Sequence, residues 1–193
     1  MAFSIDERRH RFTFDEYLRL AEASDARLEY WAGLILDMAG GAPRHSRICM
    51  NIARVLGTQL RGRPCQPYDS NLRLRAVAAN RATYADVVVV SGDLELDPED
   101  RSRQTVLNPA VVFEVASPTT ERDDRGAKLD AYKTIASIQA VVLVSQDRPE
   151  ILLHSRQPDG SWRQASFETG EVELAKIGCK LPVEEVYADL PES

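Results

Sequence analysis

The segment PAVVFEVAS, at residues 109–117, limits the fold of this chain more than any other stretch. Its apolar residues are typical of a buried strand. A single carboxylate, Glu114, interrupts the run. Because burying an unpaired carboxylate is costly, Glu114 is expected to be protonated, paired with a cation or bound to a metal. The fold must therefore supply Glu114 with a partner.

The rest of the sequence predicts helices and strands in a mixed order, which favours one α/β or α+β domain with a mixed central sheet flanked by helices. Thr13 is the expected N-cap of the first helix, and Gly62 the expected stop of the second. Helices are predicted within residues 12–24, 43–63, 124–136 and 181–190. Strands are predicted at 26–38 (a pair turning at Ala32-Gly33), 72–75, 82–90, 109–117, 139–147 and 151–167 (a hairpin turning at Asp159-Gly160).

Two polar stretches are expected to face solvent. Arg73 and Arg75 alternate with leucines, which predicts a half-exposed strand whose arginines lie on a solvated face, with contact to a DNA backbone as the alternative. Residues 94–108 are polar and contain a proline, and they are expected to form a loop.

Composition and charge argue against membrane-spanning, secreted and disulfide-rich proteins. The chain has 193 residues and a net charge of −6, which argues mildly against constitutive nucleic-acid binding without excluding it. No apolar run reaches the roughly 20 residues of a membrane span, and the first residues lack the apolar core of a signal peptide. Three cysteines without CxxC spacing predict neither a disulfide framework nor a zinc site. A reduced, cytoplasmic protein is expected.

Four charged residues stand at unusual positions: Glu29 in the first strand, Asp86 before VVVV, Glu114, and Lys128 in the helix that follows. Two carboxylates on neighbouring core strands repel each other unless a cation neutralises them. Mg²⁺, with Mn²⁺ as a substitute, binds such carboxylates and activates a phosphoryl group or a water molecule. Each residue alone also fits a turn, a strand edge or a solvated helix face, so the pattern leaves both interpretations open.

Several segments resemble the Uma-type restriction endonuclease family of the PD-(D/E)XK nuclease superfamily. In order along the chain, they are LEYWAGLILDM, PRHSRI, YADVVVV, VVFEVASPTTERDDRGAKLDAYKTI and QAVVLVSQD. The resemblance covers residues from about 12 to about 190, and EVASPTTERDDRGAKLDAY is its most specific part. It implies a restriction-endonuclease-like fold in a single domain, residues 1–193, with an Mg²⁺-dependent phosphodiesterase site.

The resemblance also implies roles for individual residues. Asp86 and Glu114 match the metal-binding acidic pair, and Glu29 matches an additional glutamate of the cluster. Ala85 stands where the family usually has proline. The residue two after Glu114 is Ala116 rather than lysine, and Lys128 matches the family's relocated lysine.

Two further residues are candidates for substrate contact. Tyr132 lies four residues after Lys128, so the two share one helix face. His45 precedes the long second helix and has the chemistry for phosphate contact or proton transfer, although a purely structural helix-start residue is an equal alternative.

The leading functional hypothesis is an Mg²⁺-dependent DNA endonuclease. Since double-strand cleavage needs two active sites, a homodimer or a higher homo-oligomer is expected, with Trp31 and its strand pair at the interface. The alternatives are a non-catalytic nucleic-acid-binding or assembly module of the same fold, and a metal-dependent hydrolase of a small phosphorylated substrate.

Overall fold

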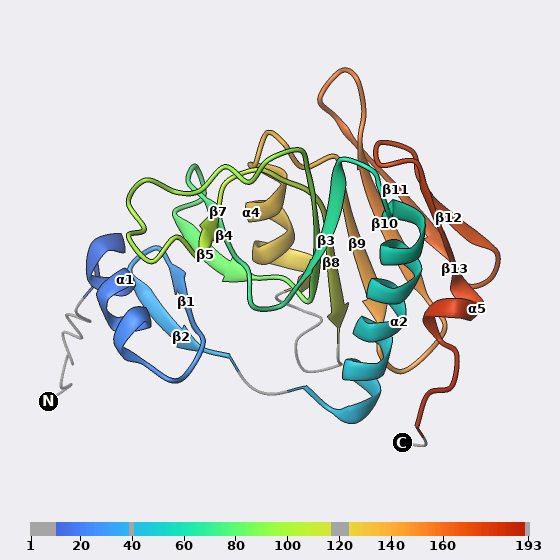
Figure 1. The fold of residues 1–193 in the computed structure, drawn as a ribbon, viewed down its shortest axis with the longest axis horizontal. Coiled ribbons are helices and arrows are strands. Elements are labelled where there is room, and N and C mark those ends of the chain that lie inside the picture. The colour runs from blue at the N-terminus through green and yellow to red at the C-terminus, as the bar shows by residue number, and fades with distance from the viewer. Residues whose placement is uncertain (1–10, 39–40, 117–123, 192–193) are drawn as a thin grey trace, which may run out of the picture.

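A computed structural model describes residues 11–38, 41–116 and 124–191 of the chain (Figure 1). Two main sheets, one of six and one of five strands, share most of the chain, and a separate two-stranded hairpin lies near the C-terminus. The mixed α+β class predicted from the sequence is confirmed, although the strands are divided between sheets rather than joined in one. Within the described part of the chain, no helix is long and apolar enough to cross a membrane.

The six-stranded sheet contains Glu114 and most of the core. Its strand order is β11-β10-β9-β8-β6-β3; β8 pairs with β9 in parallel, and the other pairs are antiparallel. Its strands are β3 (Cys65–Asp69), β6 (Val87–Ser91), β8 (Pro109–Ala116), β9 (Ala140–Ser145), β10 (Ile151–Arg156) and β11 (Trp162–Phe167).

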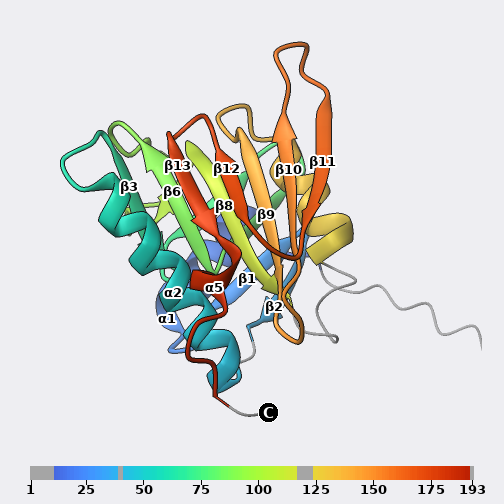
Figure 2. The ribbon, with the colours of Figure 1, turned by 90° about the vertical axis from the view of Figure 1, so that its right-hand side faces the viewer.

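One face of this sheet packs against the long helix α2 (Pro43–Leu60), the hairpin of β12 (Glu171–Leu174) and β13 (Cys179–Pro182), and the short helix α5 (Val183–Val186) (Figure 2). Proline at the first position of α2 suits a helix start, because the missing N–H has no partner there. The apolar residues of α2 recur on its buried face, as the sequence predicts: Ile48, Ile52, Val55, Leu56 and Leu60. Gly62 follows the helix with a φ of +74°, which glycine adopts without strain.

The other face packs against a helical segment that lies between the two main sheets in Figure 1. The predicted helix at 124–136 is shorter than expected and begins with a π-helical turn, η1 (Asp124–Lys128), followed by α4 (Leu129–Lys133). Gly126 has a non-helical backbone, which interrupts regular α-helical geometry inside the turn. Residue 117, the last of the predicted strand, lies outside the described residues.

The five-stranded sheet has the order β2-β1-β5-β4-β7 and packs against helix α1 (Phe14–Ala23). Thr13 caps α1 as predicted, forming reciprocal hydrogen bonds with Glu16. The predicted turn at Ala32-Gly33 joins β1 to β2, with positive φ at both residues. The strands are β1 (Leu28–Trp31), β2 (Leu34–Asp37), β4 (Arg73–Ala76), β5 (Arg81–Tyr84) and β7 (Thr105–Val106).

The prediction that one face of β4 is solvated is wrong. Arg73 and Arg75 are both buried, at 2% and 8% exposure. Arg73 pairs with the buried Asp100, with an N–O distance of 3.2 Å, and the Arg75 guanidinium lies over the Phe14 ring. The reason is that α1 and the segment at 94–108 cover this face. That segment contains β7 and the buried Asp100, so its prediction as a plain loop is also wrong.

Candidate active site

Glu114 lies on β8 and its carboxylate is bound by two side chains from the helical segment that follows. Alternation along β8 places Val112 on the face that packs against α4, and Glu114, two residues on, shares that face. Lys128 Nζ lies 2.9 Å from Glu114 Oε1 and 3.0 Å from Oε2. The Tyr132 hydroxyl donates to Oε1 at 2.5 Å. Of the outcomes expected for a buried carboxylate, the structure thus shows pairing with a cationic side chain.

Lys128 connects Glu114 to the other sheet. Its ammonium group donates to the carbonyl oxygen of Tyr84 at 3.2 Å and lies 3.8 Å from Glu29 Oε1. Glu29, on β1, also accepts hydrogen bonds from the Thr83 hydroxyl and from the Tyr84 backbone N–H. The structure therefore brings three of the predicted site residues, Glu29, Glu114 and Lys128, into one buried network.

Two positive charges balance the two carboxylates in this network. Arg81, on β5, lies 3.6 Å from Glu29 Oε2 and is almost fully buried. Lys128 serves both glutamates, so the four side chains are neutral as a group. Among the residues that the structure describes, loss of Lys128 would leave Arg81 as the cation facing the two buried carboxylates, and an uncompensated buried charge is strongly unfavourable.

Asp86 lies in the short link between β5 and β6, one residue before the first β6 pair, Val87 with Phe113. It is therefore next to Glu114 along the β6–β8 pairing. Its Oδ2 accepts a hydrogen bond from the Val115 N–H at 2.7 Å and lies 3.2 Å from His45 Nε2. The two acidic residues are neighbours in the sheet, but their carboxylates contact different helices: Asp86 contacts α2 and Glu114 contacts the α4 segment.

His45 lies in the first turn of α2 and is half-buried, as is Asp86. Its contact with Asp86 places it beside the predicted site rather than at an isolated helix start.

Tyr132 is fully buried, and its pKa is raised well above the usual value by burial and by the negative charge of Glu114. Tyr132 therefore remains a neutral hydrogen-bond donor to Glu114, because its proton is needed between the two oxygens.

The sequence reading missed Cys49, which lies one helical turn after His45. Its Sγ is 3.6 Å from His45 Nδ1. Burial, with the charges of Asp86 and Glu114, raises the pKa of the Cys49 thiol. Without a cation the thiol stays protonated, so a cysteine nucleophile is disfavoured. The i, i+4 spacing of His45 and Cys49 was the available signal in the sequence.

Asp86 and Glu114 have the donor chemistry that a hard cation requires. Both offer carboxylate oxygens, the ligand type that Mg²⁺ and Mn²⁺ prefer. Both contacts of Asp86 within the described residues go to Oδ2. Each oxygen of a carboxylate has two lone pairs, so Glu114 can contact Lys128 and a cation together. The donor types of the two side chains therefore suit a hard divalent cation.

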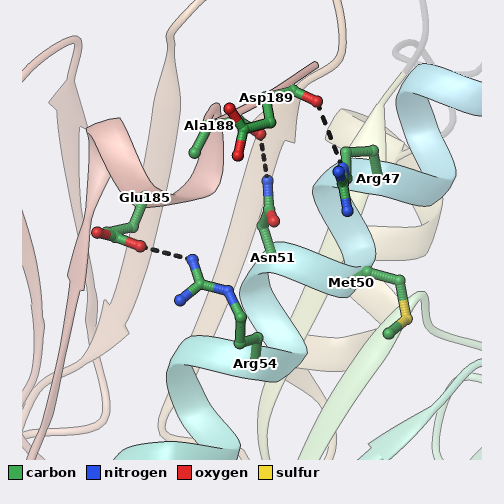
Figure 3. A pocket seen from close by; sticks show the side chains of 7 residues that line it. All are labelled: Arg47, Met50, Asn51, Arg54, Glu185, Ala188 and Asp189. Carbon is green, nitrogen blue, oxygen red and sulfur yellow. Dashed lines mark hydrogen bonds and ion pairs between the residues drawn. The ribbon is translucent and has the colours of Figure 1, made fainter. Parts of the chain in front are cut away.

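A separate groove lies between α2 and the C-terminal segment, and none of the predicted site residues lines it (Figure 3). It encloses about 600 Å³ and is lined by Arg47, Met50, Asn51, Arg54, Glu185, Ala188 and Asp189. Arg54 pairs with Glu185 at 2.5 Å, and the buried Asn51 amide donates to the carbonyl oxygens of Val186 and Ala188. These contacts attach the C-terminal segment to α2.

Comparison with known proteins gives matches over nearly the whole chain. Residues 14–184 match the sequence model of the Uma2 family, described as "Putative restriction endonuclease". Two uncharacterized proteins of Synechocystis sp. (strain ATCC 27184 / PCC 6803 / Kazusa) are 34% and 27% identical to the chain. The first match covers 91% of both chains, and the second covers 84% of this chain and 92% of the relative.

A solved structure has the same fold. It is the crystal structure of a "putative nuclease belonging to DUF820" from Anabaena variabilis ATCC 29413, with a TM-score of 0.73 and 18% identity. The match covers 91% of this chain and 97% of that one. The restriction-endonuclease-like fold predicted from the sequence is thereby confirmed.

Proposed function

The chain belongs to the Uma2 family of restriction-endonuclease-like proteins, and from this premise we propose that it is a metal-dependent endonuclease that hydrolyses phosphodiester bonds in DNA. The observation that carries the proposal is the contact of Glu114 with Lys128 and, through it, with Glu29, directly beside Asp86 in the sheet. Two neighbouring carboxylates and a buried lysine suit metal-assisted phosphodiester hydrolysis, because the carboxylates can hold a cation and the lysine can stabilise developing negative charge.

Asp86 and Glu114 would hold the cation, expected to be Mg²⁺ with Mn²⁺ as a substitute. When bound, the cation polarises a phosphoryl oxygen and lowers the pKa of a water molecule. Glu29 keeps Lys128 in place through the contact between their side chains. Lys128 supplies a positive charge that stabilises the charge developing on the phosphate. His45 and Tyr132 are the proposed substrate contacts, and each already touches one of the acidic pair.

The proposal extends to assembly as a homodimer, which would bring two such sites to the two strands of DNA. Support comes from β2, which lies at the edge of the five-stranded sheet, and from Trp31 and Leu36, which are 37% and 40% exposed. Light scattering of the purified protein measures the mass directly. A strictly monomeric species would point to nicking or to single-stranded substrates.

One observation favours the alternative of a non-catalytic module. Within the described residues, the charges of Glu29, Glu114, Lys128 and Arg81 balance without a cation, so the network can serve as a structural element. In that case DNA would not be cleaved whether or not a cation is present, and the four residues would contribute only to the stability of the fold.

Cleavage of supercoiled plasmid with Mg²⁺, with Mn²⁺ and with EDTA separates these alternatives. We expect nicked or linear product with either cation and none with EDTA. Lys128→Ala should lower the rate about 10²–10³-fold, as for loss of one electrostatic donor, and should still bind the cation. Asp86→Ala should lose cation binding and cleavage together.

The matched control is Lys176→Ala, because Lys176 is exposed and lies in the turn between β12 and β13. It should cleave at the parent rate. Thermal unfolding of each variant verifies that it folds. Cleavage by Lys128→Ala at the parent rate would exclude Lys128 from the reaction, and the absence of any metal-dependent cleavage by the folded parent would favour the non-catalytic module.

A further inference from the structure

Three side chains on the α2 side of Asp86 form a cluster of mixed ligand types. His45, Cys49 and Asp86 each offer one ligand atom, and these atoms all lie within 4.8 Å of one another. All three residues are half-buried. The cluster thus combines a nitrogen, a sulfur and an oxygen donor, which distinguishes it from an ordinary group of surface carboxylates.

The positions of the three donors are fixed by the fold. His45 and Cys49 are four residues apart on α2, so both lie on the same face of one helix. The same i, i+4 spacing lets two histidines of a zinc protease motif bind one ion. Asp86 reaches the cluster from the β5–β6 link, where the Val115 N–H holds its carboxylate. Two packed elements therefore bring the three side chains within reach of one another. The imidazole has Nε2 toward Asp86 and Nδ1 toward Cys49, so a shift of the ring is needed before one of its nitrogens can share an ion with both partners.

Gly41 gives the His45 ring the space that it occupies. A Cβ atom at this position would lie only 2.7 Å from His45 Nδ1, closer than real side chains approach. Any larger residue at 41 would displace the imidazole from its place between Asp86 and Cys49. The absence of a side chain at Gly41 therefore allows the His45 ring to occupy its position in the cluster.

The donor types select the kind of cation. Imidazole and thiolate suit zinc and its neighbours, whereas Mg²⁺ takes oxygen donors almost exclusively. Three protein ligands that leave a fourth position open are the arrangement of catalytic zinc sites. We infer that His45, Cys49 and Asp86 form a binding site for a divalent transition-metal ion of the zinc class, next to the oxygen-only position between Asp86 and Glu114.

Binding at this site converts the Cys49 thiol to a thiolate and releases its proton to solvent. Asp86 is the one residue common to both cation positions. The inference concerns binding alone and does not depend on DNA cleavage, so the two proposals can fail separately.

Cobalt is the probe, because Co²⁺ occupies zinc sites and reports a bound thiolate by a sulfur-to-cobalt charge-transfer band in the near ultraviolet. Full-length protein freed of metal with a chelator is titrated with Co²⁺ and then with Zn²⁺. We expect the band to saturate at one equivalent of Co²⁺ and to disappear as Zn²⁺ displaces it. Excess Mg²⁺ should not remove it.

Variants assign the band to its ligands. Cys49→Ser should abolish it, while Cys65→Ser and Cys179→Ser, which alter the other two free cysteines, should keep it. His45→Ala should weaken Co²⁺ binding more than about 100-fold, since losing an outer-shell partner alone costs about 10–100-fold. The spectrum of the unmodified protein is a test in itself and does not depend on any variant folding.

The inference is overturned if the parent shows no charge-transfer band at saturating Co²⁺, or if Cys49→Ser keeps the band. Plasmid cleavage is measured on the same preparations. Cobalt binding without cleavage under any cation would refute the nuclease proposal and leave this site standing, whereas Mg²⁺-dependent cleavage without the cobalt band would do the reverse.

Discussion

The two sides of the molecule achieve burial by different means. The core between α2 and the six-stranded sheet is aliphatic, built mainly from valine, isoleucine and leucine. The five-stranded sheet instead buries three arginines against aromatic rings. Arg73 and Arg75 lie over the buried rings of Tyr17 and Phe14, and Arg81 lies over the partly exposed ring of Trp31. Aliphatic packing needs only volume and burial, whereas each arginine needs partners in the right place.

This difference indicates which buried positions tolerate substitution and which do not. A slightly smaller aliphatic side chain loses part of its packing, and its cost grows with the volume removed. A buried arginine that loses its carboxylate retains the full cost of a desolvated charge. The candidate site spans both sheets, because Glu114 lies on the six-stranded sheet and Glu29 and Arg81 lie on the five-stranded sheet.

The largest effect is expected from Asp100→Ala. Arg73 would remain buried without the carboxylate that lies 3.2 Å away, and the free energy of unfolding should fall by about 4 kcal/mol. The double variant Arg73→Met with Asp100→Asn should recover part of this loss, because it removes both charges and leaves a side-chain oxygen at position 100 for hydrogen bonds from Ser102, Gln104 or Thr105. Urea unfolding measures both. A loss below about 1 kcal/mol for Asp100→Ala, the value of an exposed pair, would show that the cluster is open to solvent.

A smaller, graded effect is expected in the aliphatic core. Ile52 is fully buried on α2, so Ile52→Ala should lower the free energy of unfolding by about 3 kcal/mol and Ile52→Val by about 1 kcal/mol. The same urea experiment applies. Equal losses for the two variants would contradict a cost that follows the volume removed.

The smallest effect is expected from Tyr132→Phe, which removes the hydroxyl donated to Glu114 and should lower the free energy of unfolding by about 1 kcal/mol near neutral pH. The raised pKa of Tyr132 adds a pH dependence. The native protein keeps the phenol neutral, so its contribution is complete below the unfolded pKa of about 10 and declines as pH rises above it.

The difference in stability between the parent and Tyr132→Phe should therefore shrink from pH about 8 to pH about 11. Urea unfolding at the two pH values checks the sign. A difference that grows with pH would mean that the Tyr132 phenolate is stabilised in the native protein, against the charge of Glu114.

The sequence predicted the elements whose signals are local. The capping pair at Thr13, the helical stripe of α2 and the turn at Ala32-Gly33 each depend on residues close in the chain, and the structure has all three. The hairpin of β12 and β13 was missed, because its strands are only four residues each and lack a strong turn pair.

The burial of Arg73 and Arg75 could not be predicted from the local sequence pattern. Alternation of leucine and arginine is the same for a strand with one solvated face and for a strand covered on both sides. Only the partners distinguish the two, and Asp100 lies 27 residues from Arg73 in a segment that resembles a loop. In the candidate site, the resemblance gave the residue types, but the contact of Asp86 with His45 depends on how α2 crosses the end of β6.

The link between the two sheets has a mechanical consequence. Only Ala85 and Asp86 separate the end of β5 from the start of β6, so the chain passes from one sheet to the other within two residues. A link this short transmits a change in the angle between the sheets directly to the Asp86 carboxylate. Any molecule that binds across the two sheets and alters that angle would therefore move Asp86, a proposed cation ligand, and an insertion between Tyr84 and Val87 would separate the movements of the two sheets.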